Sequence, residues 1–583
     1  VRISAWGNTL DLLVFPFETP REAVAALTLH GGPPALAPDW TWGPWIGVQR
    51  GTDELLRTAD MLRRLHIPAT ALWAQDWIGG RANFFGGYDL PYHWEWDQEL
   101  YPDLPAVIAG LHDRGFAFLG YFNPFITEPH REFDEALEHG YLPLTPAGDP
   151  YTFSIVDRFG SVLDLANPDA RAWAKEFLVD AVAMGQDGWM CDFGEWMPLD
   201  AQVGDGMSGQ DLHNAYPVLW HELNMEALNE VAGPGNGLCF GRSGWTGDHR
   251  FTPVTWGGDQ ETSWARDDGI ATAREIGVGL GLSGVGRYGS DIAGFSSEWD
   301  GPSTEELYLR WITMGAFEPV MRTHDGLAED TNWHFEADTS TLLTFRRYAR
   351  LHMRLQPFWE LLDRQYQREG LPLMRHALLV EPGDDLLRDA PDQHFLGDDL
   401  LVAPVLEPGV VARDVVLPAG AWYGLLDGGR WVVEETAAVE VAAAMTEIPV
   451  FARAGSLLPM LAPDVVTSFP ARGDVVDAGD RDDRIDITAF HGGSGSIELV
   501  DGGRFTFVGD GAVSDGPLTW NDEATDLDQP CDDARAWDCR ESFGPGEAVY
   551  RVSWGESGTL AGPGWSLAIE GGAGRHGVLT LRY

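Results

Sequence analysis

The sequence is poor in basic residues. It holds 39 Lys and Arg against 90 Asp and Glu among its 583 residues, which gives a formal net charge of −51. Nucleic acids and anionic membrane surfaces are negatively charged themselves, so they repel a chain of this composition. We therefore expect no nucleic-acid partner and no membrane partner.

Cysteine is also scarce, and long apolar runs are missing. Four cysteines are too few for a disulfide framework, and Cys191 and Cys239 lie in apolar segments where a thiol packs as a small hydrophobe. Cys531 and Cys539 share an acidic segment, and whether they form a disulfide is left open. The sequence contains no run of about 18 apolar residues, so it predicts no membrane-spanning helix. No Cys/His cluster has the spacing of a zinc site, and we expect neither a metal nor another cofactor.

The sequence contains no internal repeat of solenoid length and no low-complexity tract. Its length is too great for a single hydrophobic core and indicates several domains. The first residue is Val1 rather than Met, so we expect the N-terminus to be incomplete. The compartment is left open, with the cytoplasm favoured, and a homo-oligomer is left open as well.

From about residue 36, short apolar strands alternate with amphipathic helices, which is typical of a parallel α/β structure. Predicted strands include 70–74 and 116–121, and the segment 169–184 is predicted as a helix. The alternation ends in a long helical stretch from 339 to 368. A region of this size fits a (β/α)8 barrel with insertions.

The flanks of this region are predicted as β structure. Residues 1 to about 28 include the alternating segment 10–15 and are predicted as strands, the tail of an otherwise missing β-sandwich. After Gly370 the sequence turns to valine-rich alternating segments separated by Gly, Pro and Asp turns, which predicts antiparallel β structure. The predicted fold class is therefore α/β. It comprises a β-sandwich remnant, a (β/α)8 TIM barrel and two all-β C-terminal domains, over residues 1–35, 36–370, 371–460 and 461–583.

Two of the predicted barrel strands end in carboxylates. The apolar segment 188–191 is followed by Asp192, and 254–256 is followed by two glycines and Asp259. A parallel barrel strand delivers its last side chains to the mouth of the fold, where such proteins carry their chemistry. Two acids are the minimum for glycoside hydrolysis, in which one attacks the anomeric carbon and the other protonates the leaving oxygen. The alternative is that both acids cap the helices that follow.

Six sequence blocks occur in the order of a known family. They are residues 40–47, 73–77, 189–195, 256–260, 290–295 and 321–324, among them Trp-Ala-Gln-Asp-Trp and Trp-Gly-Gly-Asp-Gln. Together they resemble glycoside hydrolase family 31, the α-glucosidase and α-xylosidase family, and within it the bacterial sulfoquinovosidases, over about 36 to 460. The resemblance implies a retaining exo-acting α-glycosidase with an N-terminal β-sandwich, a (β/α)8 barrel and two C-terminal β domains.

The resemblance also implies roles for single residues. Asp192 matches the family nucleophile, and Asp259 matches its acid/base. Gln75 falls where members of this branch contact the 4-hydroxyl of the sugar, and an amide supplies both a donor and an acceptor for it. Arg242 and His324 match residues that bind sugar hydroxyls near the nucleophile. The substrate-binding residues that we expect are Gln75, Tyr88, Asp89, Trp189, Glu195, Arg242, Trp256, Phe295 and His324.

The loop that binds the sulfonate in sulfoquinovosidases departs from that pattern here. Those enzymes use an Arg and a Trp in this loop and a Tyr after the Asp-Ile-Gly-Gly turn, whereas this sequence has no Arg between Ala82 and Gly110 and has Phe295 at the Tyr position. An anionic group needs charge-assisted donors, and Asp89 would repel one. We therefore favour a neutral α-glycoside whose O6 or neighbouring hydroxyl meets Asp89 or Tyr88. A solvated turn position for Asp89 is the alternative.

The sequence thus predicts a glycoside hydrolase that releases the nonreducing sugar of a small carbohydrate substrate through a covalent glycosyl-enzyme intermediate. An α-sulfoquinovosidase is the first alternative. A transglycosylase, which passes the same intermediate to a sugar acceptor, is the second. The third is a carbohydrate-binding homologue without catalysis, and the presence of both carboxylates argues against it.

Overall fold

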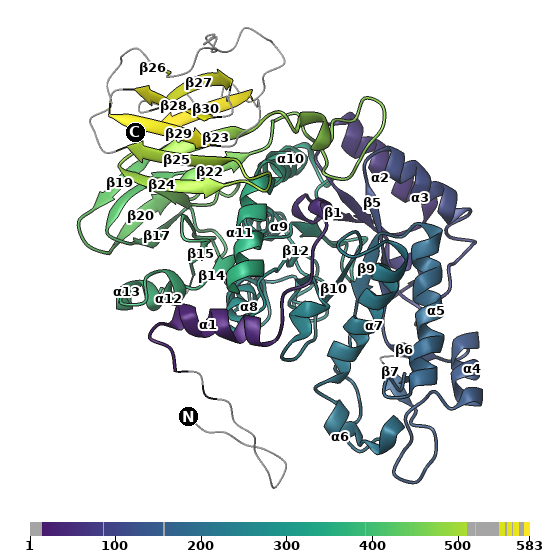
Figure 1. Ribbon diagram of the computed structural model, residues 1–583. Helices are drawn as coiled ribbons and strands as arrows, with labels where there is room; N and C mark the ends of the chain where they lie inside the picture. Colours follow the sequence, from purple (N-terminus) through teal and green to yellow (C-terminus); the bar gives the residue numbers. More distant parts are fainter. Residues whose placement is uncertain are drawn as a thin grey trace.

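The computed structural model describes residues 14, 16–84, 87–155, 158–390, 392–509, 519–520, 547–553, 557–562, 564–570 and 576–583. Figure 1 shows a barrel of strands and helices, coloured purple to teal, with β-sheets in green and yellow on one side of it. Most of the segment 10–15 and both Cys531 and Cys539 lie outside the described residues. No helix in the described part of the chain is long and apolar enough to cross a membrane.

Eight parallel strands form the barrel, in the order β11–β10–β9–β5–β2–β1–β13–β12. A parallel bridge between Thr255 of β11 and Tyr288, just before β12, joins the two ends of this sheet. The strands are β1 (Trp45–Gly47), β2 (Ala71–Trp73), β5 (Ala117–Phe122), β9 (Gly188–Cys191), β10 (Leu238–Gly241), β11 (Val254–Thr255), β12 (Asp291–Ile292) and β13 (Arg322–Thr323).

Helices alternate with these strands. They are α2 (Thr52–Arg64), α3 (Leu104–Asp113), α5 (Pro168–Met184), α7 (Tyr216–Val231), α8 (Ile270–Leu282), α9 (Glu305–Gly315) and α10 (Thr339–Arg354). Helix α5 starts where predicted, because the Asn167 side chain accepts the N–H groups of Asp169 and Ala170 and Pro168 occupies the first turn. Between β10 and β11 only the 3₁₀ turn η4 (Asp248–Arg250) remains in the place of a helix.

Three insertions follow the carboxyl ends of barrel strands. They therefore surround the rim where a barrel of this kind carries its site. The first, after β2, holds η2 (Gln75–Ile78) and the hairpin β3 (Arg81–Ala82) and β4 (Tyr88–Asp89). The second, after β5, holds β6 (Phe125–Thr127), α4 (Arg131–His139), β7 (Phe153–Ile155) and β8 (Arg158–Val162). The third, after β9, holds η3 (Gly204–Gly206) and α6 (Gly209–Leu212), and a further 3₁₀ turn, η1 (Asp39–Trp42), precedes β1.

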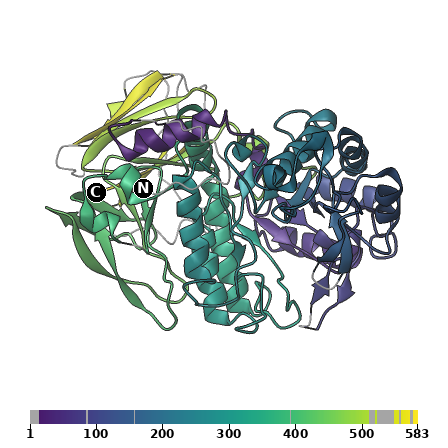
Figure 2. The ribbon, with the colours of Figure 1, turned by 90° about the horizontal axis from the view of Figure 1, so that it is seen from below.

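The helical stretch predicted for 339–368 consists of two helices. Helix α10 ends at Arg354, and α11 (Gln356–Glu369) begins directly after it. Pro357 cannot continue the hydrogen bonding of α10, so it separates the two helices. Helix α11 packs against β22 (Leu457–Met460) of the C-terminal part. Figure 2 shows this helical layer between the barrel and the β domains.

The first β domain contains a six-stranded antiparallel sheet and a two-stranded one. The larger sheet comprises β14 (Met374–Arg375), β15 (His394–Leu396), β16 (Leu400–Val402), β21 (Val450–Arg453), β18 (Gly420–Gly424) and β19 (Arg430–Val433). The smaller pairs β17 (Ala412–Leu417) with β20 (Ala437–Ala442), and the helices α12 (Ala377–Val380) and α13 (Asp385–Arg388) lie between β14 and β15 in the chain.

The second β domain has its own buried core, built around Ile487, Phe507 and Leu567. One sheet contains β22, β23 (Asp486–Phe490), β30 (His576–Arg582) and β27 (Glu547–Ser553). The other contains β24 (Gly493–Glu498), β25 (Arg504–Gly509), β29 (Trp565–Glu570), β28 (Ser557–Gly562) and β26 (Thr519–Trp520). Strand β22 already pairs in this domain, so the two β domains meet a few residues before 460. The predicted α/β fold, with a barrel followed by all-β domains, is confirmed.

The N-terminal segment differs from the prediction. Residues Pro20–His30 form helix α1, where we expected strands. The Thr19 side chain accepts the N–H of Glu22, and the Glu22 carboxylate accepts the N–H of Thr19, which is a capping box. With Pro20 in the first turn, these local signals favour a helix over the weak alternation of apolar residues. Helix α1 packs beside α12, as Figure 1 shows.

Candidate active site

The side chains expected to act on substrate leave the barrel at one end. They follow different strands: Gln75 after β2, Asp192 after β9, Arg242 after β10, Asp259 after β11 and His324 after β13. Because all eight strands are parallel, their carboxyl ends open at the same rim. Residues far apart in sequence therefore meet in one place.

Three donors hold the Asp192 carboxylate. The Tyr121 hydroxyl donates to Oδ2 at 2.6 Å, and the backbone N–H of Phe193 donates to Oδ1 at 2.8 Å. Nε of Arg242 lies 3.3 Å from Oδ1. Phe193 has a φ of 58° and Gly194 a φ of 110°, so the chain turns sharply just after the strand and directs the carboxylate into the rim. These donors stabilise negative charge on the carboxylate, as a nucleophile requires.

Tyr121 was not among the predicted site residues. Its hydroxyl also accepts a hydrogen bond from Nδ2 of Asn123 at 3.1 Å. Burial, and then the charge of Asp192, raise the pKa of Tyr121 far above its usual range, so the hydroxyl keeps its proton and remains a donor. The sequence predicted the strand that carries Tyr121 but not which face of the strand the ring occupies.

Arg242 connects the two predicted catalytic acids. Its Nη1 lies 2.8 Å from Oδ2 of Asp259, and its Nη2 lies 2.8 Å from Oε1 of Glu195. The guanidinium carbon also stands 4.1 Å from the ring centre of Phe193. Because one guanidinium contacts both Asp192 and Asp259, the two acids are no farther apart than the roughly 5 to 9.5 Å that glycosidase acid pairs span.

The surroundings of Asp259 suit a proton donor. Burial raises the pKa of Asp259 to about 6, against the opposing charge of Arg242 and with support from Asp192 and Asp291. The side chain keeps 44% of its surface open, so it is desolvated by the walls of the cleft and not by complete enclosure. A carboxyl with such a pKa is protonated in part of the molecules near neutral pH, as a general acid must be.

Arg242 itself stays charged. Burial alone would lower its pKa, but Asp192, Asp259 and Glu195 together raise it above the usual value. Its positive charge is therefore shared among three carboxylates.

His324 is prepared to donate a hydrogen bond. Its Nδ1 accepts the backbone N–H of Gly326 at 2.8 Å, which places the ring proton on Nε2. Burial, and then the charge of Arg322, hold the pKa of His324 well below its usual range, so the ring is neutral. Trp73 and Phe295 meet this ring edge to face at 4.7 and 4.9 Å between ring centres.

A buried ion pair lies in the same end of the barrel. Nη1 of Arg322 is 2.7 Å from Oδ1 of Asp291, and both side chains are 1% exposed. The Arg322 guanidinium stands over the rings of Trp73 and Phe240, at 5.0 and 4.9 Å. The sequence blocks contained both charged residues, but their pairing depends on the contact between β12 and β13.

Two predicted tryptophans take other places. The prediction that Trp189 lines the cleft is wrong: it is fully buried, and its indole donates to Oδ1 of Asn224 on α7 at 2.7 Å. Side chains alternate along a strand, so Trp189 points to the helix layer while Asp192 points to the rim. Trp256 is 1% exposed and packs against Phe240, so it lies beneath the cleft surface.

Gln75 and Tyr92 complete the described surroundings. Gln75 is buried at the start of η2, with 7% of its surface exposed. Tyr92 was not predicted as a site residue, yet its ring packs against Phe125 and Phe193 at 5.9 Å. Burial, and then the charge of Asp192, raise the pKa of Tyr92, which places its hydroxyl within the field of Asp192 and Asp259.

The hairpin β3–β4 carries Tyr88 and Asp89. Oδ2 of Asp89 lies 3.7 Å from Nη2 of Arg81, its partner across the hairpin, and Oδ1 accepts a hydrogen bond from Asn83 at 3.4 Å. Arg81 lies directly before the segment 82–110, which contains no arginine, so the sequence pattern did not point to it. The hairpin therefore contains one arginine, and that arginine faces an acid.

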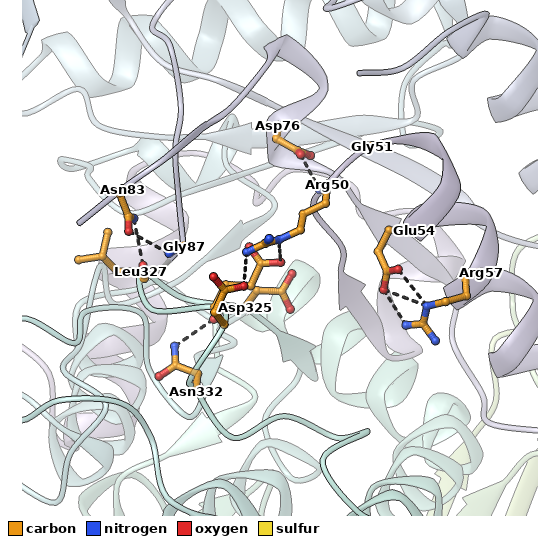
Figure 3. A network of polar contacts seen from close by, with 12 residues as sticks. Arg50, Gly51, Glu54, Arg57, Asp76, Asn83, Gly87, Asp325, Leu327 and Asn332 are labelled. Atoms are coloured by element: carbon orange, nitrogen blue, oxygen red, sulfur yellow. Dashed lines mark hydrogen bonds and ion pairs between the residues drawn. The ribbon is translucent and has the colours of Figure 1, made fainter. Parts of the chain in front are cut away.

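Leu327 anchors this hairpin at the rim. Nδ2 of Asn83 donates to the carbonyl of Leu327 at 3.0 Å, as Figure 3 shows. The N–H of Leu327 in turn donates to the carbonyl of Phe295 at 2.8 Å. The hairpin thus reaches Phe295 through the loop that follows β13.

Arg50 ties that loop to the rest of the rim (Figure 3). Its backbone N–H donates to Oδ2 of Asp76 at 2.7 Å, while its side chain contacts Glu329 at 2.7 Å and Asp330 at 2.6 Å. Burial raises the pKa of Asp76 to about 7. Burial, and then Glu329 and Asp76, raise the pKa of Asp325 well above its usual range. One arginine thus holds together a group of acids that would otherwise repel each other.

Comparison with known proteins agrees with this geometry. Residues 34–361 match the family model described as "Glycosyl hydrolases family 31 TIM-barrel domain", and residues 370–458 match "Glycosyl hydrolase family 31 C-terminal domain". The sulfoquinovosidase of Escherichia coli K12 is 36% identical over 430 residues, which are 73% of this chain and 63% of that protein. The sulfoquinovosidase of Agrobacterium fabrum is 33% identical over 458 residues, 78% of this chain and 68% of that protein.

More distant relatives and solved structures fit the same family. An α-xylosidase of Emericella nidulans is 27% identical over 480 residues, 79% of this chain and 58% of that protein. Among solved structures, a family 31 sulfoquinovosidase from E. rectale in complex with the aza-sugar inhibitor IFGSQ matches with a TM-score of 0.72 and 33% identity. That match covers 76% of this chain and 66% of the other. The chain spans 63 to 68% of the length of the sulfoquinovosidases that it matches, and the resemblance found in the sequence is confirmed.

Proposed function

The chain belongs to glycoside hydrolase family 31, and on that basis we propose that it is a retaining exo-α-glycosidase that removes a neutral sugar from the nonreducing end of a small carbohydrate. The observation that carries this proposal is the guanidinium of Arg242, which contacts Asp192 and Asp259 at once. It brings together Asp192, which accepts three donors, and Asp259, whose pKa is raised.

The first chemical step forms an ester. Oδ1 or Oδ2 of Asp192 bonds to C1 of the sugar as the bond between C1 and the leaving oxygen breaks. Asp259 gives its proton to that oxygen, and the leaving group departs as a neutral alcohol. Asp192 loses its negative charge as the ester forms, so its hydrogen bonds from Tyr121 and the Phe193 N–H become weaker. Arg242 then faces the newly ionised Asp259.

The second step reverses the roles. Water bonds to C1 through its oxygen and gives a proton to the Asp259 carboxylate, while the ester bond to Asp192 breaks. Two inversions at C1 leave the released sugar in its α configuration. His324, with its Nε2 proton, and the amide of Gln75 are placed to bind hydroxyls of the sugar during both steps.

The charge of the rim supports a neutral sugar. Asp192, Asp259 and Glu195 surround the single guanidinium of Arg242, which has no charge left over for a sulfonate. In the hairpin, Arg81 faces Asp89. An anionic group bound there would need a cation whose charge is not already balanced.

A sulfoquinovosidase is the second candidate. The two curated relatives described above with more than 30% identity carry that name. Arg81 also stands in the hairpin that reaches the rim at Phe295, so rearrangement of its contact with Asp89 would bring a cation to the sugar.

A panel of 4-nitrophenyl α-glycosides tests both candidates. We expect kcat/KM for the best neutral glycoside to exceed that for the sulfoquinovoside by about tenfold or more, since Arg242 and Arg81 each face carboxylates. NMR of the first product should show the α anomer. Higher turnover of the sulfoquinovoside would establish the second candidate, and a β anomer would contradict the retaining mechanism. Binding without any turnover would point to a carbohydrate-binding homologue, and transfer to added sugars would point to a transglycosylase.

A further inference from the structure

A cavity of about 550 Å³ opens beside Arg242 and Asp259. Its walls come from three connections: Glu195, His213 and Asn214 lie between β9 and α7, Trp245 lies after β10, and Gly257, Gly258 and Asp259 lie after β11. The volume lies within the roughly 300 to 1,000 Å³ that small-molecule sites span. This volume is much larger than a small leaving group such as glycerol would fill.

The position of the cavity shows which part of a substrate it faces. The described residues that line it include Asp259 but not Asp192, Gln75 or His324. A general acid must touch the oxygen between the two halves of a glycoside, while the nucleophile must lie against the ring that is being attacked. A cavity that reaches the acid and not the nucleophile therefore receives the leaving group.

We propose that this cavity selects a neutral sugar as the leaving group, with one face of its ring stacked on Trp245. The inference rests on the proposed function and adds the identity of the second half of the substrate. Trp245 leaves 58% of its surface exposed at the cavity, although a large apolar ring is usually buried. A flat, exposed indole is suited to the C–H face of a pyranose.

The loop that carries Trp245 is fixed in place. The carbonyl of Trp245 accepts the N–H of Asp248 at 3.0 Å. The Asp248 carboxylate contacts Nδ1 of the buried His221 at 2.8 Å and accepts the Thr252 hydroxyl at 2.7 Å. The indole therefore stands on a backbone that is already ordered, so little entropy is lost when a ring stacks on it.

The opposite wall offers partners for hydroxyl groups. Nδ1 of His213 contacts the carbonyl of Met197 at 2.6 Å, so this nitrogen carries a proton and Nε2 is left to bind a hydroxyl group. The exposed amide of Asn214 supplies a donor and an acceptor. A sugar hydroxyl needs both kinds of partner, whereas an alkyl or aryl leaving group uses neither.

Charge and backbone shape narrow the ligand further. Glu195 and Asp259 lie in the walls, and the Arg242 guanidinium beside them already pairs with both, so an anionic leaving group is disfavoured. Gly258 has a φ of 88°, and a Cβ added there would meet only Cδ of Arg242, at 3.9 Å. The glycine thus leaves the space beside the acid open for the ring that carries the leaving oxygen.

Trp245→Ala tests the inference through two substrates with the same sugar at the nonreducing end. One is a neutral disaccharide, and the other is the α-glycosyl fluoride, whose leaving group is a single atom that leaves the cavity unfilled. We expect the ratio of kcat/KM for disaccharide over fluoride to fall about tenfold to 30-fold, which corresponds to the loss of one stacked ring. Trp299→Ala, at an 83% exposed tryptophan outside the cavity lining, is the matched control and should leave the ratio unchanged.

The outcomes separate the two proposals. If the parent protein hydrolyses no glycosyl fluoride, the proposed function fails. If the fluoride is hydrolysed and Trp245→Ala leaves the ratio unchanged, or Trp299→Ala lowers it equally, only the leaving-group inference fails. A second measurement uses acceptors at equal concentration: a neutral monosaccharide should intercept the intermediate several times more often than glycerol in the parent. Equal interception would overturn the inference without any variant.

Discussion

The two halves of the cleft are built differently. On the sugar side, the side chain of Asp192 is 11% exposed and is held by Tyr121, Phe193 and Arg242. On the leaving-group side, the side chain of Asp259 is 44% exposed and faces an open cavity. A nucleophile must meet one carbon atom in one direction, whereas an acid must first follow a departing oxygen and then receive a proton from water. Rigidity serves the first role, and access serves the second.

Removal of Asp192, the proposed nucleophile, should have the largest effect on activity. We expect Asp192→Ala to lower kcat/KM by about 10⁴-fold or more for every substrate, because the covalent step has no other acceptor for C1. Added azide should restore turnover of an activated aryl glycoside and yield the β-glycosyl azide, detectable by NMR. Asp169→Asn, at an exposed position on α5, is the control. Parent-like activity of Asp192→Ala would contradict the assignment.

Removal of the acid should discriminate between leaving groups. Asp259→Asn is expected to lower kcat/KM about 10²- to 10⁴-fold for a disaccharide, but far less for a glycosyl fluoride, which needs no proton. The parent should lose activity on the disaccharide as pH rises through about 6, the pKa of Asp259, because the acid loses its proton. A pH profile of Asp259→Asn that still showed this alkaline limb would contradict the assignment.

Loss of one donor to the nucleophile should have an intermediate effect. Tyr121→Phe removes the hydroxyl that donates to Asp192 at 2.6 Å. A hydrogen bond to a charged group contributes about 1.5 to 3 kcal/mol, so we expect kcat/KM to fall by about tenfold to 100-fold. Disaccharide and fluoride should be affected equally, since the defect lies on the sugar side. Tyr151→Phe, which removes a hydroxyl bonded to Asp200 at the surface, should have no such effect.

The smallest effect is expected at the Arg50 network. Arg50→Met removes the cation that pairs with Glu329 and Asp330, while the backbone N–H that donates to Asp76 is retained. Burial raises the folded-state pKa of Glu329 against the opposing effect of Arg50, so loss of Arg50 raises this pKa further. A carboxylate whose folded-state pKa is raised stabilises the fold at low pH and loses that contribution as pH rises. The melting temperature should therefore fall by a few degrees more at pH 8 than at pH 5. Arg57→Met, at an exposed ion pair with Glu54, is the control with a smaller shift.

The sequence was informative where one signal decided the outcome. Apolar segments that end in an acid predicted the strands before Asp192 and Asp259, and Asn167 with Pro168 predicted the start of α5. Arg242 was expected beside the nucleophile, and it lies there.

Other features depended on contacts that no local pattern contains. Tyr121 lies one residue before the end of the buried strand β5, and only the register against β9 brings its hydroxyl to Asp192. Trp189 was assigned to the cleft because it stands in a family block, although strand alternation turns it outward. The cavity beside Trp245 is formed by the connections that follow three successive strands, β9, β10 and β11, and its volume follows from how they pack.

The attachment of the β3–β4 hairpin has a consequence for how the substrate specificity of such a barrel can change. The Asn83 side chain donates to the main-chain carbonyl of Leu327 in the neighbouring loop, so the join depends on Asn83 and not on the side chains at 81, 88 and 89. Substitutions at positions 81, 88 and 89 thus leave the attachment of the hairpin to the barrel rim in place. We therefore expect substitutions at these three positions to change which sugar is accepted without moving Asp192 or Asp259.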